Sequence, residues 1–112
     1  MEQLRLNAYH IMWLFVFFDL PVTTKKQIKA ATGFRKNLIK DGFTMMQYSV
    51  YIRHCASRES AEVHVKRVRR FVPEKGQVSI LSITDKQYGN IVNFIGRKEK
   101  EMGSAPAQLE LF

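Results

Sequence analysis

The sequence predicts an α+β domain in which two helices lie on one face of an antiparallel sheet. The first reason is the apolar run 11–18, which has the length and the aromatic and β-branched content of a strand. The second is a pair of segments with helical periodicity, one at 25–40 and one that begins after Ser57. The third is the extended pattern of segments 43–52 and 78–84, which follow the first and the second helix.

The predicted first strand consists of eight consecutive apolar residues, 11–18, and is followed by Asp19 and Pro21. The side chains of a strand alternate between two faces, so an unbroken apolar run indicates that both faces are covered. The helices cover one of them. In a chain of 112 residues we expect a second copy to cover the other, which predicts a homodimer that packs through its sheet faces.

The first helix is predicted to begin after Thr24, because Thr24 and Gln27 have the spacing of a capping box. It should run to Lys40, just before Gly42, which can close a helix in the left-handed conformation. A helical turn of about 100° per residue gathers its apolar residues in one arc, namely Ala31, Phe34, Leu38, Ile28 and Ile39. A narrow stripe away from this arc contains Lys25, Lys29, Lys36 and Lys40.

The segment 43–52 is predicted to form two short strands, with an interruption near Gln47. Ser57 should cap the second helix. The apolar face of that helix consists of Ala61, Val65, Val68 and Phe71. A strand at 78–84 and a short further strand at 91–95 are expected to follow.

This order of elements is βαββαβ, the ferredoxin-like arrangement, with an additional C-terminal strand. We therefore expect a ferredoxin-like domain over residues 1–95. Residues 96–112 are predicted to be a linker and a C-terminal tail, because they are rich in charged and small residues. The last five, 108–112, alternate polar and apolar side chains like an unpaired strand.

Composition points to a soluble protein with a polyanionic partner. The formal net charge is +8 and the isoelectric point is about 9.9, which favours polyanionic partners such as nucleic acid or an anionic membrane surface. Cys55 is the single cysteine, so no internal disulfide can form. No apolar run approaches the roughly 18 residues of a membrane span, and no signal region is recognisable. We expect a cytoplasmic protein that does not enter a membrane.

Asp19 has two interpretations. As a structural residue, it would end the strand and favour the N-terminus of the next helix by its charge. As a functional residue, it would be a ligand of Mg²⁺ and a catalytic group, because Mg²⁺ is often held by one or two carboxylates together with water and phosphate oxygens. Two-fold symmetry could bring two copies of Asp19 to one cleft. The sequence places no second acid beside it, so any nuclease activity should be slow or conditional.

The lysine stripe Lys25, Lys29, Lys36 and Lys40 predicts a surface that follows a line of phosphates. Arg53 and Arg58 flank the start of the second helix and are predicted to bind phosphates as well. The alternatives are a solvated helix face and ordinary surface packing. The three histidines, His10, His54 and His64, and Cys55 lack the spacing of a metal site or a nucleophilic pair, so we expect structural roles.

Several segments together resemble a known family. They are the strand ending Phe-Phe-Asp19-Leu-Pro21, the basic first helix, the segment Gln47-Tyr48-Ser49-Val50-Tyr51, and the second basic helix before 78–84. From residue 9 to about 95 the chain is similar to the small CRISPR-associated endoribonuclease family, the second Cas protein (Cas two), in the form found in type II systems.

This resemblance implies a ferredoxin-like homodimer that acts in spacer acquisition. It would bind double-stranded DNA and bridge two dimers of the larger CRISPR integrase subunit. It also implies that Asp19 is the Mg²⁺ ligand for hydrolysis of RNA or DNA, although members of the family differ in whether they cleave at all. The C-terminal strands of the family complete a neighbouring sheet, which Leu109, Leu111 and Phe112 would suit.

Two other functions fit the same order of elements. A single-stranded RNA-binding sheet of the RNA-recognition-motif type would be a monomer with exposed aromatic side chains. A toxin-type ribonuclease would share the fold, but would have an antitoxin partner. A dimer that hides the aromatic residues of the first strand would argue against the RNA-binding sheet.

Overall fold

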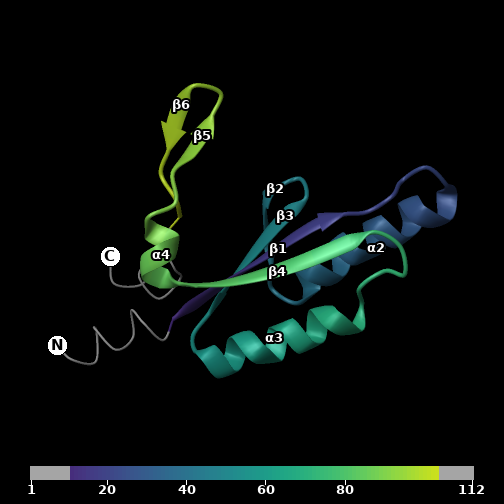
Figure 1. The fold of residues 1–112 in the computed structure, drawn as a ribbon, viewed down its shortest axis with the longest axis horizontal. Helices are drawn as coiled ribbons and strands as arrows, with labels where there is room; N and C mark the ends of the chain where they lie inside the picture. The colour runs from purple at the N-terminus through teal and green to yellow at the C-terminus, as the bar shows by residue number, and fades with distance from the viewer. Residues whose placement is uncertain (1–10, 104–112) are drawn as a thin grey trace.

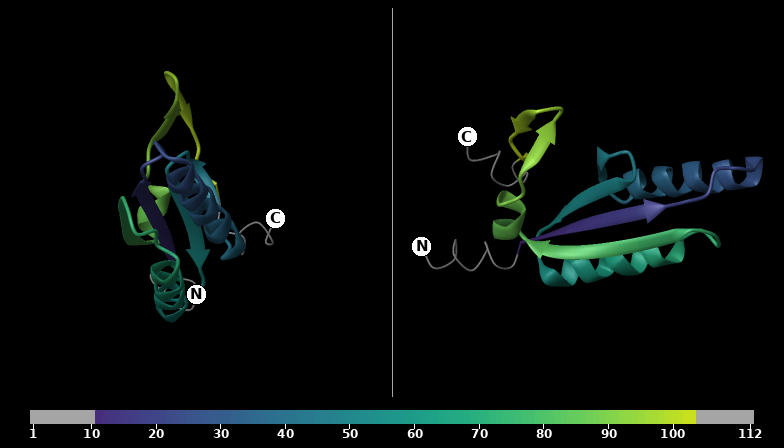
Figure 2. Two further views of the ribbon diagram at one scale, coloured as in Figure 1. Left: turned by 90° about the vertical axis from the view of Figure 1, so that its right-hand side faces the viewer. Right: turned by 45° about the horizontal axis from the view of Figure 1, so that its top comes forward.

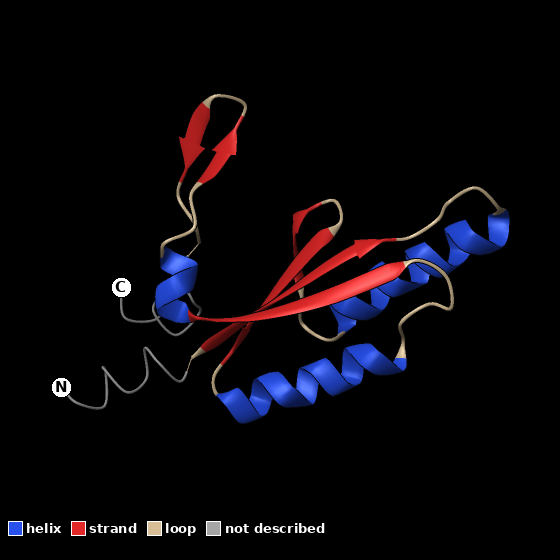
Figure 3. Cartoon of the chain, viewed as in Figure 1, coloured by secondary structure: helices blue, strands red, loops and turns tan. Residues whose placement is uncertain are grey.

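The structure is a computed structural model that describes residues 11–103. Its elements, drawn in Figures 1 and 3, are β1 (Met12–Asp19), α2 (Lys25–Lys40), β2 (Thr44–Gln47), β3 (Val50–Cys55), α3 (Arg58–Arg70), β4 (Gln77–Thr84), α4 (Asp85–Gly89), β5 (Asn93–Ile95) and β6 (Lys98–Lys100). The predicted strand at 108–112 lies outside the described residues.

The main sheet has the strand order β2-β3-β1-β4, and every neighbouring pair is antiparallel. β1 is central, so that Met12 lies opposite Cys55 on one side and Thr84 on the other. The two long helices, α2 and α3, run along the sheet, as the views in Figure 2 show. An α+β domain with an antiparallel sheet is thus confirmed.

Alternate residues of β1 enter two separate cores. One core lies between the sheet and the two long helices, and contains Met12, Leu14, Val16 and Phe18 of β1 together with Phe34, Leu38, Ala61 and Val68 of the helices. The other lies on the opposite face and contains Trp13 and Phe15. The strand is therefore apolar on both faces because both faces are covered over much of its length.

Part of the second cover comes from this chain. The Trp13 ring is stacked on the Tyr88 ring of α4, with 3.8 Å between the centroids and 5° between the planes. Trp13 Nε1 also donates a hydrogen bond of 2.8 Å to Asp85 Oδ1. This cover ends before Phe17, which is exposed. The second copy that we expect over the remainder of this face stays a prediction.

The helix α2 begins and ends where the sequence predicted, and its capping box is present. The Gln27 amide donates to Thr24 Oγ1 at 3.1 Å, and the Thr24 amide donates to Gln27 Oε1 at 3.1 Å. Its buried residues are Ala31, Phe34 and Leu38. The expectation that Ile28 and Ile39 also belong to the packed face is wrong, since 49% and 58% of these residues are exposed. They lie at the flank of the apolar arc, where the helix surface turns away from the sheet.

The C-terminal region differs from the expectation in two ways. The short helix α4 replaces a direct link to the next strand, and it begins with a second capping box between Thr84 and Gln87. Within the segment 91–95, β5 does not join the main sheet. It pairs with β6 in a separate hairpin that stands away from the body in Figure 1. A strand therefore lies in the segment that the sequence predicted as linker.

Candidate nucleic-acid interface and metal site

Asp19 is the last residue of β1 and is exposed. It pairs with Gln77 of β4, and the alternation of the strand places it on the face of Phe17, away from the two long helices. Among residues 11–103, no hydrogen bond or ion pair engages its carboxylate. Asp19 thus ends the strand, as its structural interpretation expects, while the N-terminus of α2 is capped by Thr24.

A glycine in the segment before β4 packs closely against the turn that follows Asp19. Gly76 has a φ of +97°, and a Cβ at this position would lie 2.7 Å from the Asp19 carbonyl oxygen and 2.8 Å from Leu20 Cδ2. The segment before β4 therefore approaches the end of β1 more closely than any side chain allows. The sequence alone does not reveal this contact, because it depends on the pairing of β1 with β4.

The Asp19 carboxylate is suited to be one ligand of a hard cation. Mg²⁺ takes oxygen ligands and keeps several waters, so a single exposed carboxylate is a suitable contribution. In the described part of the chain, no three His, Cys, Asp or Glu side chains come together as a metal site. A complete site would need oxygen ligands from a second copy or from phosphate.

The four lysines of the predicted stripe are all exposed on α2, and none forms an ion pair within the described residues. At 1.5 Å per residue the stripe from Lys25 to Lys40 is about 22 Å long. That length corresponds to roughly six phosphates on one strand of a duplex, at 3.4 Å each. The stripe thus offers four uncompensated positive charges in a row.

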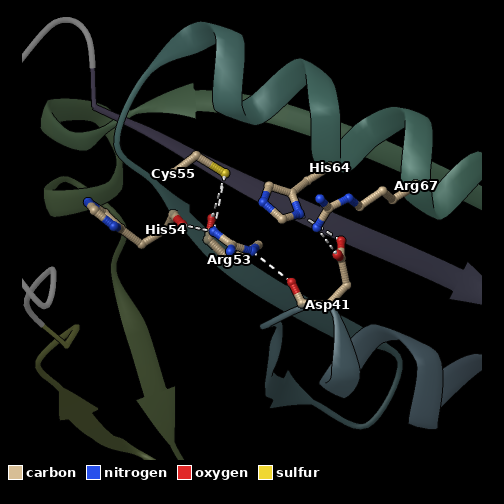
Figure 4. A network of polar contacts seen from close by, with 6 residues as sticks. All are labelled: Asp41, Arg53, His54, Cys55, His64 and Arg67. Carbon is tan, nitrogen blue, oxygen red and sulfur yellow. Dashed lines mark hydrogen bonds and ion pairs between the residues drawn. The ribbon is translucent and has the colours of Figure 1, made fainter.

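Arg53 is half-buried and largely engaged inside the protein (Figure 4). Its Nε donates to the Asp41 carbonyl oxygen at 2.8 Å, and its Nη1 donates to the His54 carbonyl oxygen at 2.6 Å. These bonds tie the end of α2 to β3. Of the donors on this guanidinium, those of Nη2 are left for a phosphate.

The same network extends to α3. His64 Nδ1 donates to Asp41 Oδ2 at 2.7 Å, and Arg67 Nη1 donates to Asp41 Oδ1 at 3.1 Å. His64 is buried, in agreement with the structural role expected for it. The sequence alone does not reveal this role of Asp41, because its partners lie more than 20 residues away on another helix.

The neighbouring His54 and Cys55 are unsuited to nucleophilic chemistry. Burial lowers the pKa of His54 from its usual value near 6.5, and the Asp85 charge opposes this shift. Burial raises the pKa of the Cys55 thiol, which is fully enclosed. A buried thiol with a raised pKa is a packing residue rather than a nucleophile.

Arg58 is exposed at the first position of α3. It lines a cavity of about 340 Å³ together with Lys66 and Arg69, at the end of the sheet where β1 begins. The predicted phosphate ligands are therefore not one cluster. Four lie on α2, whereas Arg53 and Arg58 lie near the junction of β3 with α3.

No helix among residues 11–103 is both long and apolar enough to cross a membrane.

Taken together, these features define a small basic α+β domain with an acidic strand end and a lysine-lined helix. Residues 12–91 match the protein family described as CRISPR associated protein Cas2.

Curated relatives extend this match over nearly the whole chain. A protein of Flavobacterium psychrophilum named CRISPR-associated endoribonuclease Cas2 is 54% identical over 108 residues, which cover 96% of this chain and 94% of the relative. A protein of the same name from Parvibaculum lavamentivorans is 55% identical over 101 residues, which cover 90% and 100%. The chain belongs to the Cas2 family.

A solved structure described as a crystal structure of cas2 has the same fold. The TM-score is 0.55 at 21% sequence identity, and the match covers 85% of this chain and 98% of the other. The resemblance stated from the sequence is confirmed by the family match and by the relatives.

Proposed function

We propose that this protein is an adaptation subunit of a CRISPR system that binds double-stranded DNA and bridges integrase dimers during spacer acquisition. The observation that carries the proposal is the row of four exposed lysines on α2, which form no ion pair with any residue in 11–103. Membership of the Cas2 family supports the setting. The strand order β2-β3-β1-β4 with two crossover helices supports the finer assignment to the ferredoxin-like fold.

The proposed working unit is a homodimer that packs through the open face of the sheet. A groove of about 410 Å³ lies on this face, and its apolar lining includes Phe15, Phe17, Met46, Val50, Leu81 and Ile83. An apolar surface of this kind is suited to a second copy of the same sheet. Because Asp19 lies on the face of Phe17, such packing would bring two carboxylates toward one symmetry axis.

A second candidate function is Mg²⁺-dependent endonuclease activity at Asp19. The relatives carry the name endoribonuclease, and the Asp19 carboxylate is exposed and unpaired in the described residues. A bound Mg²⁺ would supply charge neutralisation at the phosphate. The role of Asp19 would be to bind the cation, and the role of the lysines would be to align the phosphate backbone beside it. A single carboxylate per chain makes this activity slow.

Duplex binding is tested with a charge-matched pair of variants. One replaces Lys25, Lys29, Lys36 and Lys40 with Glu. The control replaces Lys75, Lys86, Lys98 and Lys100, four exposed lysines elsewhere, with Glu. Fluorescence anisotropy with a blunt DNA duplex should show loss of binding in the first variant. The control should retain binding, although its net charge has changed by the same amount.

The salt dependence of the parent protein gives a second measure. Each phosphate contact contributes about 0.9 to the slope of log affinity against log salt concentration. Four lysine contacts per chain predict a slope of about −3.6 from α2. Equal binding by the two variants, or a flat salt dependence of the parent protein, would remove the assignment of α2 as the DNA-binding surface.

A further inference from the structure

Arg35 lies between two aromatic rings at the end of the sheet that carries Asp19. Its guanidinium carbon is 4.2 Å from the centroid of the Tyr48 ring and 5.2 Å from that of Phe18. Among residues 11–103 it makes no hydrogen bond or ion pair, and its Nε is buried without a partner. The rings hold this positive charge in place, and no described carboxylate neutralises it.

Tyr48 is largely exposed although its side chain is a large aromatic ring. It occupies the turn between β2 and β3, and 70% of the residue is accessible to solvent. Phe18, by contrast, is buried and belongs to the core below Arg35. The Tyr48 ring is thus backed by the guanidinium while most of its surface remains open. An exposed ring beside a cation is the arrangement on which nucleobases stack.

The position of this pair links it to the rest of the site. The Phe18 amide donates to the Ser49 carbonyl oxygen at 3.1 Å, which holds the β2–β3 turn against the end of β1. The β1–β3 register, continued past Phe17 and Val50, brings the backbone of Tyr48 opposite Asp19. On α2, Arg35 directly precedes Lys36 of the lysine stripe. The pair therefore lies on the helix that carries the lysine stripe and at the end of the sheet that carries Asp19. It is on the helix side of that end, whereas the alternation of β1 directs the Asp19 side chain to the opposite face.

We propose that Arg35 and Tyr48 form a binding site for one unpaired nucleotide. The base stacks on the open side of the Tyr48 ring, and the guanidinium binds the adjoining phosphate. This inference rests on the proposed nucleic-acid binding and specifies its ligand further. A DNA duplex with single-stranded ends would be preferred to a blunt one, because an unpaired base leaves its stack at a lower energetic cost than a paired base.

The proposal is tested by comparing a blunt duplex with the same duplex carrying short thymidine tails. The parent protein should bind the tailed duplex about tenfold more tightly, within the range of one base stacked on an aromatic side chain. Tyr48→Ala should abolish this preference and leave the affinity for the blunt duplex unchanged, whereas Tyr48→Phe should retain it. Arg35→Gln should weaken the preference. Phe94→Ala, which removes another exposed aromatic ring, is the matched control and should behave like the parent.

A structural readout accompanies the affinities. With 5-iodouracil in the tail, irradiation should crosslink the nucleotide to Tyr48, as mapped by mass spectrometry of the peptides. Equal affinity of the parent for blunt and tailed duplexes would overturn the nucleotide site and leave duplex binding intact. Binding of tailed but not blunt DNA would support the nucleotide site and overturn the proposed duplex function. Absence of binding to both would overturn the two together.

Discussion

The carboxylate of Asp41 accepts a 2.7 Å hydrogen bond from Nδ1 of His64, which joins the end of α2 to the middle of α3. Both side chains are less than one tenth exposed. Arg67 completes the group from a side chain that is 54% exposed. The two helices that cover the sheet are thereby fastened to one another by a buried polar contact, in addition to their contacts with β1.

Replacing Asp41 with Ala should lower the free energy of unfolding by about 2 kcal/mol, because His64 would remain buried without its partner. Urea unfolding at one fixed protein concentration measures the change. Arg67→Ala is the control, and it should cost less than about 1 kcal/mol because that ion pair is largely solvated. Equal losses in the two variants would show that the buried contact to His64 is not the dominant part of the group.

Gly76→Ala should destabilise the protein by about 1–3 kcal/mol, since it combines a positive φ with a contact of 2.7 Å to the Asp19 carbonyl oxygen. Gly33→Ala on α2 is the opposite case. Its Cβ would meet nothing within 4 Å, so the change should stabilise the helix by about 0.5–1 kcal/mol. Thermal unfolding should show a lower melting temperature for Gly76→Ala and a higher one for Gly33→Ala. A neutral Gly76→Ala would mean that the turn after β1 can shift freely.

His54 should make the free energy of unfolding fall as the pH is lowered through about 6.5. Burial lowers the pKa of this imidazole in the folded protein, so the unfolded chain takes up the proton first and is favoured as pH decreases. The contribution is complete once the pH lies below the folded pKa. His54→Phe keeps an aromatic ring and removes the titration, and its melting temperature should depend less steeply on pH between 7.5 and 5. Parallel pH profiles would exclude His54 as a source.

Asp19→Asn should eliminate Mg²⁺-dependent cleavage of RNA or DNA, while the oligomeric state and the affinity for a blunt duplex are retained. The exposed position of Asp19 makes a folding defect unexpected. Glu99→Gln on the β5–β6 hairpin removes another exposed carboxylate and should leave cleavage unchanged. Cleavage by Asp19→Asn at the parent rate would remove Asp19 from the catalytic role. A parent protein that cuts neither polymer would remove the nuclease proposal and leave the DNA-binding proposal in place.

Leu81→Glu should convert the proposed homodimer into a folded monomer. Leu81 is 49% exposed on the open face of the sheet, and a charge there would have to be buried against the second copy. Val63→Glu places the same charge on the exposed side of α3 and should remain a dimer. Light scattering measures the mass of both variants. A monomeric parent protein would contradict the packing through sheet faces and would favour the alternative of an RNA-binding sheet.

Local patterns in the sequence were sufficient to predict much of the fold. The helix over Lys25–Lys40 and its Thr24 cap were predictable because capping boxes and apolar periodicity act over three or four residues. The strand that ends at Asp19 was predictable for a similar reason, since its apolar run stops at one charge. These features determine where the acidic strand end and the lysine row lie.

Features that depend on tertiary contacts were not predictable. The exposure of Ile28 and Ile39 depends on how α2 lies on the sheet, which helical periodicity does not specify. The helix α4 is five residues long, too short for a periodic signal, and only its Thr84 cap could have indicated it. The engagement of Arg53 with Asp41, 12 residues earlier, and the stacking of Arg35 on Tyr48 were equally inaccessible, because both join segments that meet only in the folded chain.

The stack of Trp13 on Tyr88 makes the intrinsic fluorescence of Trp13 sensitive to the position of α4. Trp13 is the single tryptophan in the sequence, and its indole is enclosed between the main sheet and α4. Any event that separates α4 from the sheet would admit water to this indole and shift its emission to longer wavelength. Movements of the C-terminal hairpin that involve α4 can therefore be followed by fluorescence without a label, before and after DNA or a second copy is added.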